Sequence, residues 1–371
     1  MEMTPKIVAI SDLHFGHIRV PSSDTANDIR RHLFPQLDAS VDMLTISGDV
    51  FDRLISMNQN DSLTVLELFT DIFKICAKYD IVLRIVRGTF SHDHRQLDFI
   101  YKLYCKLDLV IDYRSFDTLF LEYIKRFDIH ILYIPDNLPY ATKEDVLENI
   151  HMFLKASDIK AVDYVIMHGE LSHLIFGHIN PKAFHAEDFD QICKRFVISG
   201  HIHKPLFYKK TISVGSFNRL AHNEEEQKGF WIIQEQPKFV PNKTATIFRT
   251  INCTKIATIE ELLEKYTSVA NELDPDRLSF IRVIIRDIHI KHTLSRYNDT
   301  QYPNIRLTFK TSPIKDNLND TFLYEKLAKK QDVTLEIPSL ANVASIVFND
   351  LQRKGIFIDI KDIRYIIHDT V

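Results

Sequence analysis

Five short polar clusters carry residue types that bind metal ions or transfer protons, and each cluster follows a short apolar run. They are SDLHFGH from residue 11, SGDVFDR from 47, RGTFSHD from 87, MHGELSH from 167 and SGHIHKP from 199. Parallel strands end at the same edge of a sheet, so the loops that follow them converge in space even when they lie far apart in the chain. The sequence therefore predicts one site built from five loops.

The side chains that could reach this site are carboxylates and imidazoles, without a thiolate. Such ligands suit Mn²⁺, Fe²⁺ or Mg²⁺ better than a structural zinc. The ligands are too many for one ion, which predicts two divalent ions with Asp49 as the bridge. Two ions about 3.5–4 Å apart can hold a phosphate ester and generate hydroxide near neutral pH. The predicted ligands are Asp12, His14, Asp49, His168, His201 and His203.

The composition bounds the class of protein. The chain has 371 residues, of which 45% are hydrophobic and 26% charged, so it can form a large core and more than one domain. Its net charge of −4 excludes a global basic field, so any phosphate binding must come from local charge or metal. Four scattered cysteines without a CxxC pair indicate a reducing compartment. With no signal peptide and no spanning apolar run, we expect a cytoplasmic protein, in the host cytoplasm if viral, without membrane contact.

The elements that must position the clusters alternate between strands and helices. The segments between the apolar runs are predicted to be helical near residues 24–37, 61–79, 97–106 and 142–156, and in residues 61–79 the apolar residues recur at helical spacing. This alternation predicts a mixed sheet with helices on both faces. The predicted strands are KIVAIS, VDMLTIS, IVLRIV, IHILYI, AVDYVIM, RFVIS and TISVGS.

The pattern changes near residue 235, where QEQPKFVPNK carries two prolines. An amphipathic helix over 258–273, with Thr258 and Glu261 as a capping box, and the strands LSFIRVIIRDIHI and NIRLTFKT predict a small second domain. A helix over 340–354 in the tail is the better candidate for a partner surface. We therefore predict three regions, which are residues 1–235, 236–312 and 313–371.

The order of the five clusters resembles the signature of the calcineurin-like metallophosphoesterases. Within that superfamily, SDLHFGH, SGDVFD, SGHIHKP and the later SVGSFNRLAHNEEEQKGFWII resemble SbcD, the nuclease subunit of the SbcC–SbcD complex, and its phage counterparts. The motifs span about residues 6–235. The resemblance implies an α/β fold, a two-sheet metallophosphoesterase sandwich flanked by helices, with a small α+β capping domain and a C-terminal partner-binding tail.

The resemblance also implies a role for each site residue. His92 would protonate the leaving group or stabilise the developing charge, and Asp93 would orient His92 and fix its tautomer. The first ion would be held by Asp12, His14, Asp49 and His203. The second ion would be held by Asp49, His168 and His201, with help from Ser91 at the third-motif position.

The chain departs from the family pattern in its third motif, which is normally Gly-Asn-His-Asp with the asparagine as a ligand. Here the loop from Gly88 to Asp93 is two residues longer, and Ser91 is predicted to stand in the asparagine position as a weaker neutral ligand. Asp52 stands where the family often has a histidine. The predicted substrate-binding residues are Arg87, Arg95 and Lys204. His185 and His222 are interpreted as surface residues.

The resemblance implies a two-metal-dependent DNA phosphodiesterase, an exonuclease or endonuclease subunit of an SbcC–SbcD-type complex in recombination, repair or replication. Its ions would be Mn²⁺, with Mg²⁺ or Fe²⁺ as alternatives, and its partners DNA, an SbcC-type coiled-coil ATPase and a second copy in a homodimer. One alternative is a small-molecule phosphodiesterase or phosphatase with the same site, against which stands the long chain after the core. Another is a non-catalytic scaffold for the ATPase, which the altered third motif favours and the intact ligands and His92 oppose.

Overall fold

The computed structural model describes residues 4–56, 60–136, 138–139, 142–174, 182–256, 258–286 and 290–311. The chain divides into two compact units, residues 1–312 and 313–371. The second unit, which includes the helix predicted over 340–354, lies outside the described residues. None of the described helices is both long enough and apolar enough to cross a membrane.

The first sheet holds the strands that lead into three of the five clusters. Its order is β12-β11-β1-β2-β3-β4, in which β1 to β4 run parallel while β11 and β12 are antiparallel to their neighbours. The strands are β1 (Ile7–Ile10), β2 (Met43–Ser47), β3 (Val82–Val86), β4 (Tyr113–Phe116), β11 (Gly229–Ile233) and β12 (Lys238–Pro241).

The second sheet leads into the other two clusters. Its order is β5-β6-β7-β8-β10-β9, in which the four central strands run parallel and the two edge strands are antiparallel. Its strands are β5 (Phe120–Ile124), β6 (Ile129–Ile134), β7 (Val162–His168), β8 (Cys193–Gly200), β9 (Leu206–Tyr208) and β10 (Thr211–Ser213).

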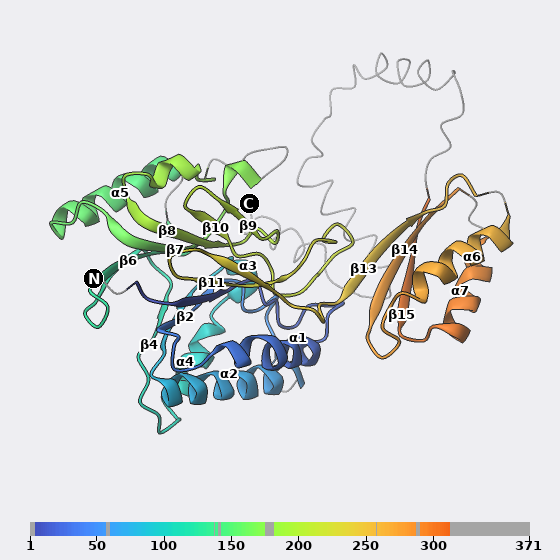
Figure 1. Cartoon of the computed structure of the whole chain (residues 1–371), viewed down its shortest axis with the longest axis horizontal. Helices are drawn as coiled ribbons and strands as arrows, with labels where there is room; N and C mark the ends of the chain where they lie inside the picture. The colour runs from blue at the N-terminus through green and yellow to red at the C-terminus, as the bar shows by residue number, and fades with distance from the viewer. Residues whose placement is uncertain are drawn as a thin grey trace, which may run out of the picture. The chain divides into compact units, whose positions relative to one another are not determined.

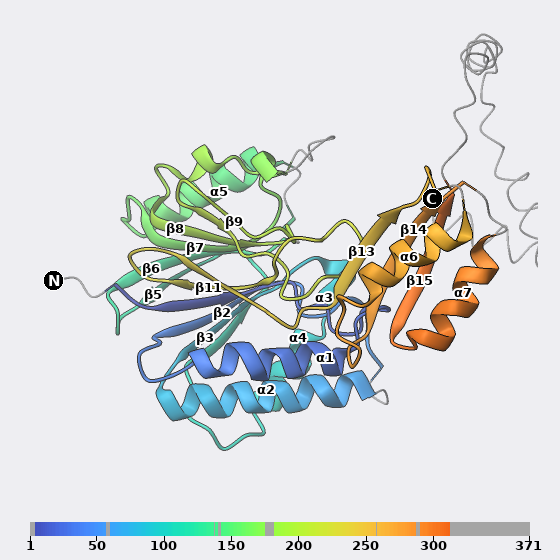
Figure 2. The ribbon, with the colours of Figure 1, turned by 45° about the vertical axis from the view of Figure 1, so that its right-hand side comes forward.

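The two sheets pack face to face and helices cover their outer faces (Figures 1 and 2). Because side chains alternate along a strand, Ile7 and Ala9 of β1 face the second sheet while Val8 and Ile10 face the helices. The first sheet is covered by α1 (Ser22–Asp28), α2 (Asn60–Tyr79) and α4 (Leu97–Tyr104), and the second by α5 (Lys143–Ala156).

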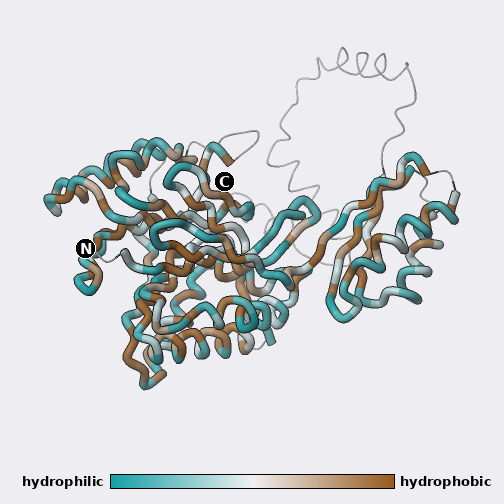
Figure 3. The backbone as a smooth tube through the Cα atoms, viewed as in Figure 1, coloured by the Kyte–Doolittle hydropathy of each residue, from teal (hydrophilic) through white to brown (hydrophobic). Residues whose placement is uncertain are grey.

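This arrangement confirms the α/β sandwich flanked by helices, and corrects the single mixed sheet that the strand pattern alone predicted. Hydrophobic segments concentrate along the strands, whereas most connecting loops are hydrophilic (Figure 3). Strands buried on both faces are continuously apolar, which is why the sequence pattern does not separate one sheet from two.

A third sheet follows, of three parallel strands, here called the cap sheet: β13 (Ile247–Asn252), β14 (Ser279–Ile285) and β15 (Ile305–Thr311). The strands are joined by α6 (Ile259–Ala270) and α7 (Ile290–Gln301). We expected an α+β arrangement, but parallel strands joined by helices form an α/β unit. Since β12 pairs with β11, the first sheet continues to Pro241, beyond the boundary predicted at residue 235.

The cap sheet contacts the sandwich through an ion pair and an aromatic stack. Arg277 donates to both carboxylate oxygens of the buried Asp28 of α1 at 3.0 Å each. Phe248 of β13 stacks on Phe280 of β14 with ring centroids 4.6 Å apart, and both pack on Val20 and Leu220 of the sandwich region. The cap sheet is therefore joined to the sandwich by a paired charge beside an apolar contact.

His222 lies buried at this junction, edge-on to Phe248 with ring centroids 5.1 Å apart, so interpreting it as a surface residue was wrong. Burial, with the nearby charges of Arg282 and Arg19, lowers the pKa of His222 to about 4. The unfolded chain, with an ordinary histidine pKa near 6.5, therefore binds the proton first as the pH falls. The resulting loss of stability begins near pH 6.5 and is complete below pH 4.

We therefore predict that His222→Gln reduces the loss of stability between pH 7 and pH 5 by about 2 kcal/mol. The measurement is urea unfolding of both proteins in EDTA at the two pH values. His151→Gln, on the exposed surface of α5, is the matched control and should behave as wild type. Equal pH dependence in wild type and His222→Gln would contradict the assignment.

Candidate metal centre

The predicted ligands lie at the carboxyl ends of parallel strands in both sheets. Asp12 and His14 follow β1 and Asp49 follows β2, whereas His168 ends β7 and the pair His201 and His203 follows β8. Two sheets that pack face to face bring these ends together. The structure therefore gathers all six predicted ligands, as the sequence predicted.

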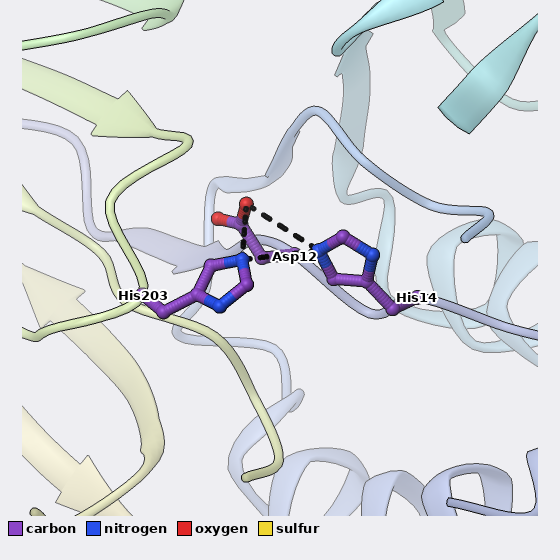
Figure 4. A group of neighbouring side chains, drawn as sticks. All are labelled: Asp12, His14 and His203. Atoms are coloured by element: carbon purple, nitrogen blue, oxygen red, sulfur yellow. Dashed lines mark hydrogen bonds and ion pairs between the residues drawn. The ribbon is translucent and has the colours of Figure 1, made fainter. Parts of the chain in front are cut away.

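Asp12, His14 and His203 form the first ligand group (Figure 4). The Nε2 atoms of His14 and His203 lie 3.1 Å apart, and the Asp12 Oδ1 atom lies 3.9 Å and 3.7 Å from them. The Asp12 side chain is held in place by the His201 backbone N–H, which donates to both carboxylate oxygens. Two nitrogens and one oxygen thus face a common point.

The tautomers of the two imidazoles follow from their outer contacts. Nδ1–H of His14 donates to Asp52 Oδ1 at 3.1 Å, and Nδ1–H of His203 donates to Glu224 Oε1 at 2.9 Å. In the neutral rings both Nε2 atoms then carry lone pairs, and these lone pairs point at each other. Such a pair is repulsive unless a proton or a metal ion bridges the nitrogens. Two imidazole nitrogens and a carboxylate oxygen that face one point fit a divalent ion.

Asp49, His168 and His201 form the second ligand group. His168 is fully buried, and its Nδ1–H donates to the Ser47 carbonyl at 2.7 Å, which again leaves Nε2 as the free nitrogen. That Nε2 lies 3.3 Å from Asp49 Oδ1 and forms no hydrogen bond within the described residues. A buried nitrogen left in this way fits a metal ligand.

Asp49 faces both groups. Its Oδ1 lies 3.3 Å from His168 Nε2, and its Oδ2 lies 3.8 Å from His14 Nε2. Burial alone would raise the pKa of Asp49 and lower that of His168. Without an ion, the carboxylate instead raises the pKa of His168 to about 10, and the charge of the protonated ring holds the Asp49 pKa well below its usual range. A bound ion would take the place of this proton on Nε2. The carboxylate is therefore ionised and placed between the two groups, as a bridging ligand must be.

The backbone is held in unusual conformations at these ligands. Asp12, His14, Asp49 and His201 have φ values of 51°, 48°, 47° and 87°. Residues other than glycine seldom adopt this left-handed region, and each such residue costs on the order of 1–3 kcal/mol. Gly48 has φ 91°, and a Cβ there would lie 2.2 Å from Nδ1 of His168. The sharp turns after β1, β2 and β8 thus direct ligands that regular backbone would point elsewhere.

His92 lies beside the first ligand group. Its ring is edge-on to that of His14 at a centroid distance of 5.1 Å, and its Nδ1–H donates to the Asp52 carbonyl at 2.6 Å. Nε2 of His92 is thus left for a substrate. The group His14, Asp52 and His92 is also close enough to hold an ion, but its contacts are those of residues that orient the imidazoles.

We expected Asp93 to orient His92, but its side chain does not contact that ring. The short helix α3 (Phe90–Asp93) turns the Asp93 side chain inward, where its oxygens accept from the backbone N–H groups of Phe51 at 3.0 Å and Gly88 at 2.8 Å. Asp93 is fully buried and ties the loop after β2 to the loop after β3. The carbonyl of Asp52 takes the orienting role.

The remaining predicted residues lie at the edge of the site or outside it. Ser91 is exposed on α3, and its role as a ligand stays a prediction. The Arg87 guanidinium contacts Asp98 and Asp117, and Arg95 also contacts Asp98, so the described contacts of both arginines lie outside the ligand groups. Lys204 is exposed directly after His203 and stays a prediction.

Comparison with known proteins adds a relative. No family model matches the chain. The DNA double-strand break repair protein Mre11 of Nanoarchaeum equitans (strain Kin4-M) is 23% identical over 345 residues, covering 86% of this chain and 84% of the relative. One solved crystal structure covers 65% of this chain and 100% of its own chain at 10% identity, with a TM-score of 0.38 that carries no argument. The chain is thus similar, over most of its length, to a DNA double-strand break repair protein.

The sequence analysis missed two residues that support the first ligand group. Lys228 is fully buried and donates to Glu226, to the His203 carbonyl and, at 3.1 Å, to Glu224. Burial alone would raise the pKa of Glu224, but the hydrogen bond from His203 and the charge of Lys228 lower it to about 2. The sequence did not single out Glu224, because it is one of three adjacent glutamates in HNEEEQKGF and their spacing does not indicate which one is buried.

We predict that Glu224→Ala weakens Mn²⁺ binding by about 10–100-fold, because His203 loses the carboxylate that fixes its tautomer. The measurement is calorimetric titration of Mn²⁺ into EDTA-treated protein. The exposed neighbour Glu225→Ala is the matched control and should bind Mn²⁺ as wild type does. Unchanged affinity in Glu224→Ala, with folding intact by circular dichroism, would refute the role of this carboxylate.

Proposed function

We propose that the chain is a metal-dependent phosphodiesterase that cuts DNA, an SbcD-type nuclease subunit of a DNA end-processing complex. The observation that carries the proposal is Asp49, whose two carboxylate oxygens face two separate ligand groups at the meeting edge of two sheets. The similarity to a DNA double-strand break repair protein selects DNA among phosphate esters.

The chain's own residues divide the work. Asp12, His14, Asp49 and His203 would hold one ion, and Asp49, His168 and His201 the other, with Mn²⁺ as the proposed metal. When bound, two such ions polarise the phosphate and lower the pKa of water. Because the chain has a net charge of −4, the ions also supply the positive charge that a DNA backbone requires.

His92 is the proposed proton donor to the leaving oxygen. Its Nδ1–H is engaged by the Asp52 carbonyl, so Nε2 is the atom that meets the substrate. A protonated Nε2 can donate to an oxygen that gains charge as the ester bond breaks. The contact with Asp52 fixes the ring without neutralising it, because a carbonyl carries no net charge.

The regions outside the sandwich would engage DNA and partners. The cap sheet and its helices, within the region predicted as 236–312, are the proposed DNA-engaging domain. Residues 313–371, which lie outside the described residues, are the segment proposed to bind an SbcC-type coiled-coil ATPase. A homodimer completes the proposed assembly.

We predict that His92→Gln lowers the rate of Mn²⁺-dependent cleavage of linear duplex DNA by about 10²–10⁴-fold while Mn²⁺ binding is retained, because the variant loses the proton donor and keeps every ligand. The assay follows labelled DNA ends on gels in Mn²⁺ or in EDTA. His151→Gln on α5 serves as the control and should cleave at the wild-type rate.

The same assay separates the alternatives. Cleavage of bis-p-nitrophenyl phosphate without cleavage of DNA would favour a small-molecule phosphodiesterase. Absence of turnover on both substrates, with two ions bound and the ATPase bound, would favour a scaffold subunit.

A second prediction concerns the terminal unit. A chain that ends at residue 312 should keep Mn²⁺-dependent hydrolysis of bis-p-nitrophenyl phosphate, because the sandwich and the cap sheet lie within the first compact unit. It should lose binding to an SbcC-type ATPase, measured by co-sedimentation of the two proteins. Full-length protein is the control, and equal ATPase binding by the shortened chain would contradict the assignment.

A further inference from the structure

The loop after β3 holds a hydroxyl that the predicted ligand set does not use. This loop was expected to supply a ligand through Ser91, but Ser91 is exposed on α3. Thr89 lies two residues earlier, directly after Gly88, and its position differs. Its backbone N–H donates to Asp49 Oδ1 at 2.7 Å, the same oxygen that faces His168.

The Thr89 hydroxyl has no internal hydrogen bond. Thr89 occupies the N-cap position of α3, where a threonine oxygen commonly accepts from the first turn, yet its side chain makes no such bond. The Thr89 carbonyl accepts instead from the N–H groups of His92 and Asp93, at 2.9 Å each. Thr89 Oγ1 is buried and has no hydrogen-bond partner within the described residues.

The surroundings of Thr89 indicate what this oxygen meets. A cavity of about 250 Å³ is lined by Thr89 together with His168 and His201, the two imidazoles of the second ligand group. Asp49 Oδ1, the third member of that group, is bonded to the Thr89 backbone. Thr89 therefore borders the space that the ligands of the second ion share, and its hydroxyl is the side-chain oxygen it could offer there.

We propose that Thr89 Oγ1 is the oxygen ligand that completes the shell of the second ion. The proposal rests on the two-metal site proposed above and assigns its missing member. Gly88 and Thr89 then match the Gly-Asn of the related motif, and Phe90 and Ser91 are the two extra residues. They form a helical turn after the ligand, and this turn carries His92 to its place beside His14.

A hydroxyl ligand gives the second ion a different character from an amide ligand. A neutral hydroxyl oxygen is the weaker ligand, so the second ion binds less tightly than it would with asparagine. Unlike an amide oxygen, the hydroxyl also keeps an O–H that can donate to a phosphate oxygen. Thr89 thus lowers the affinity for the second ion and adds a donor at the same point.

The experiment titrates Mn²⁺ alone into the EDTA-treated full chain and follows binding by calorimetry and by electron paramagnetic resonance, which distinguishes single from coupled ions. Thr89→Val keeps the shape and removes the hydroxyl, so it should weaken the second ion about tenfold or more and leave the first unchanged. Thr89→Asn should tighten the second ion about tenfold. Ser91→Ala should bind both ions as wild type does.

Two outcomes overturn the proposal, namely wild-type affinity for the second ion in Thr89→Val, or loss of that ion in Ser91→Ala. Circular dichroism of each variant in EDTA identifies any that misfold, and Thr89→Asn remains a test by gain if Thr89→Val is unstable. Failure of the proposed function is distinguishable, because a wild-type chain that cuts no DNA can still bind two ions and report the role of Thr89.

Discussion

The structure depends on holding two imidazole lone pairs against each other. His14 and His203 come from strands in different sheets, and their Nε2 atoms lie 3.1 Å apart. Neither ring can turn away, because Asp52 and Glu224 bind the opposite nitrogens. The fold therefore maintains an arrangement that needs a bridging proton or a bound cation. The ionised Asp49 carboxylate lies between the two ligand groups, and without an ion His168 stabilises its charge.

The energy that sustains this arrangement comes from the layers on either side. The sandwich buries apolar side chains between its sheets and beneath the helices on both outer faces, and this large burial outweighs the cost of left-handed backbone at Asp12, His14, Asp49 and His201. The two stacked sheets also bring the five loops to one place. One parallel sheet would spread five loops along its edge, whereas two sheets bring the ends of β1 and β2 opposite those of β7 and β8.

The positions of the candidate ligands could be predicted from the sequence, because clusters of carboxylates and imidazoles directly after buried strands are typical of metal sites. The strands before the clusters and the helices α2, α5 and α6 followed from periodicity and capping; the Thr258 hydroxyl accepts from the Glu261 N–H at 3.2 Å as expected. The pattern did not predict α7, whose mostly polar sequence has only a short apolar stripe at Leu294 and Tyr297. It also did not predict the partner of His92. Asp93 is adjacent to His92 in sequence, but one helical turn points the two side chains in different directions. The sequence also could not decide whether Ser91 or Thr89 stands at the asparagine position of the third motif, since the two extra residues can be placed before or after that position.

The two ligand groups differ in ways that make the ions unequal. Both imidazoles of the first group donate to carboxylates, which increases the electron density on their free nitrogens and strengthens them as ligands. In the second group, His168 donates only to the neutral Ser47 carbonyl. Both groups face the Asp49 carboxylate, and the first group adds the Asp12 carboxylate, whereas the proposed addition to the second group is the neutral Thr89 hydroxyl. Charge and basicity therefore both favour filling the first group before the second. An enzyme built in this way responds to the supply of divalent metal through its second ion, with its first ion already in place.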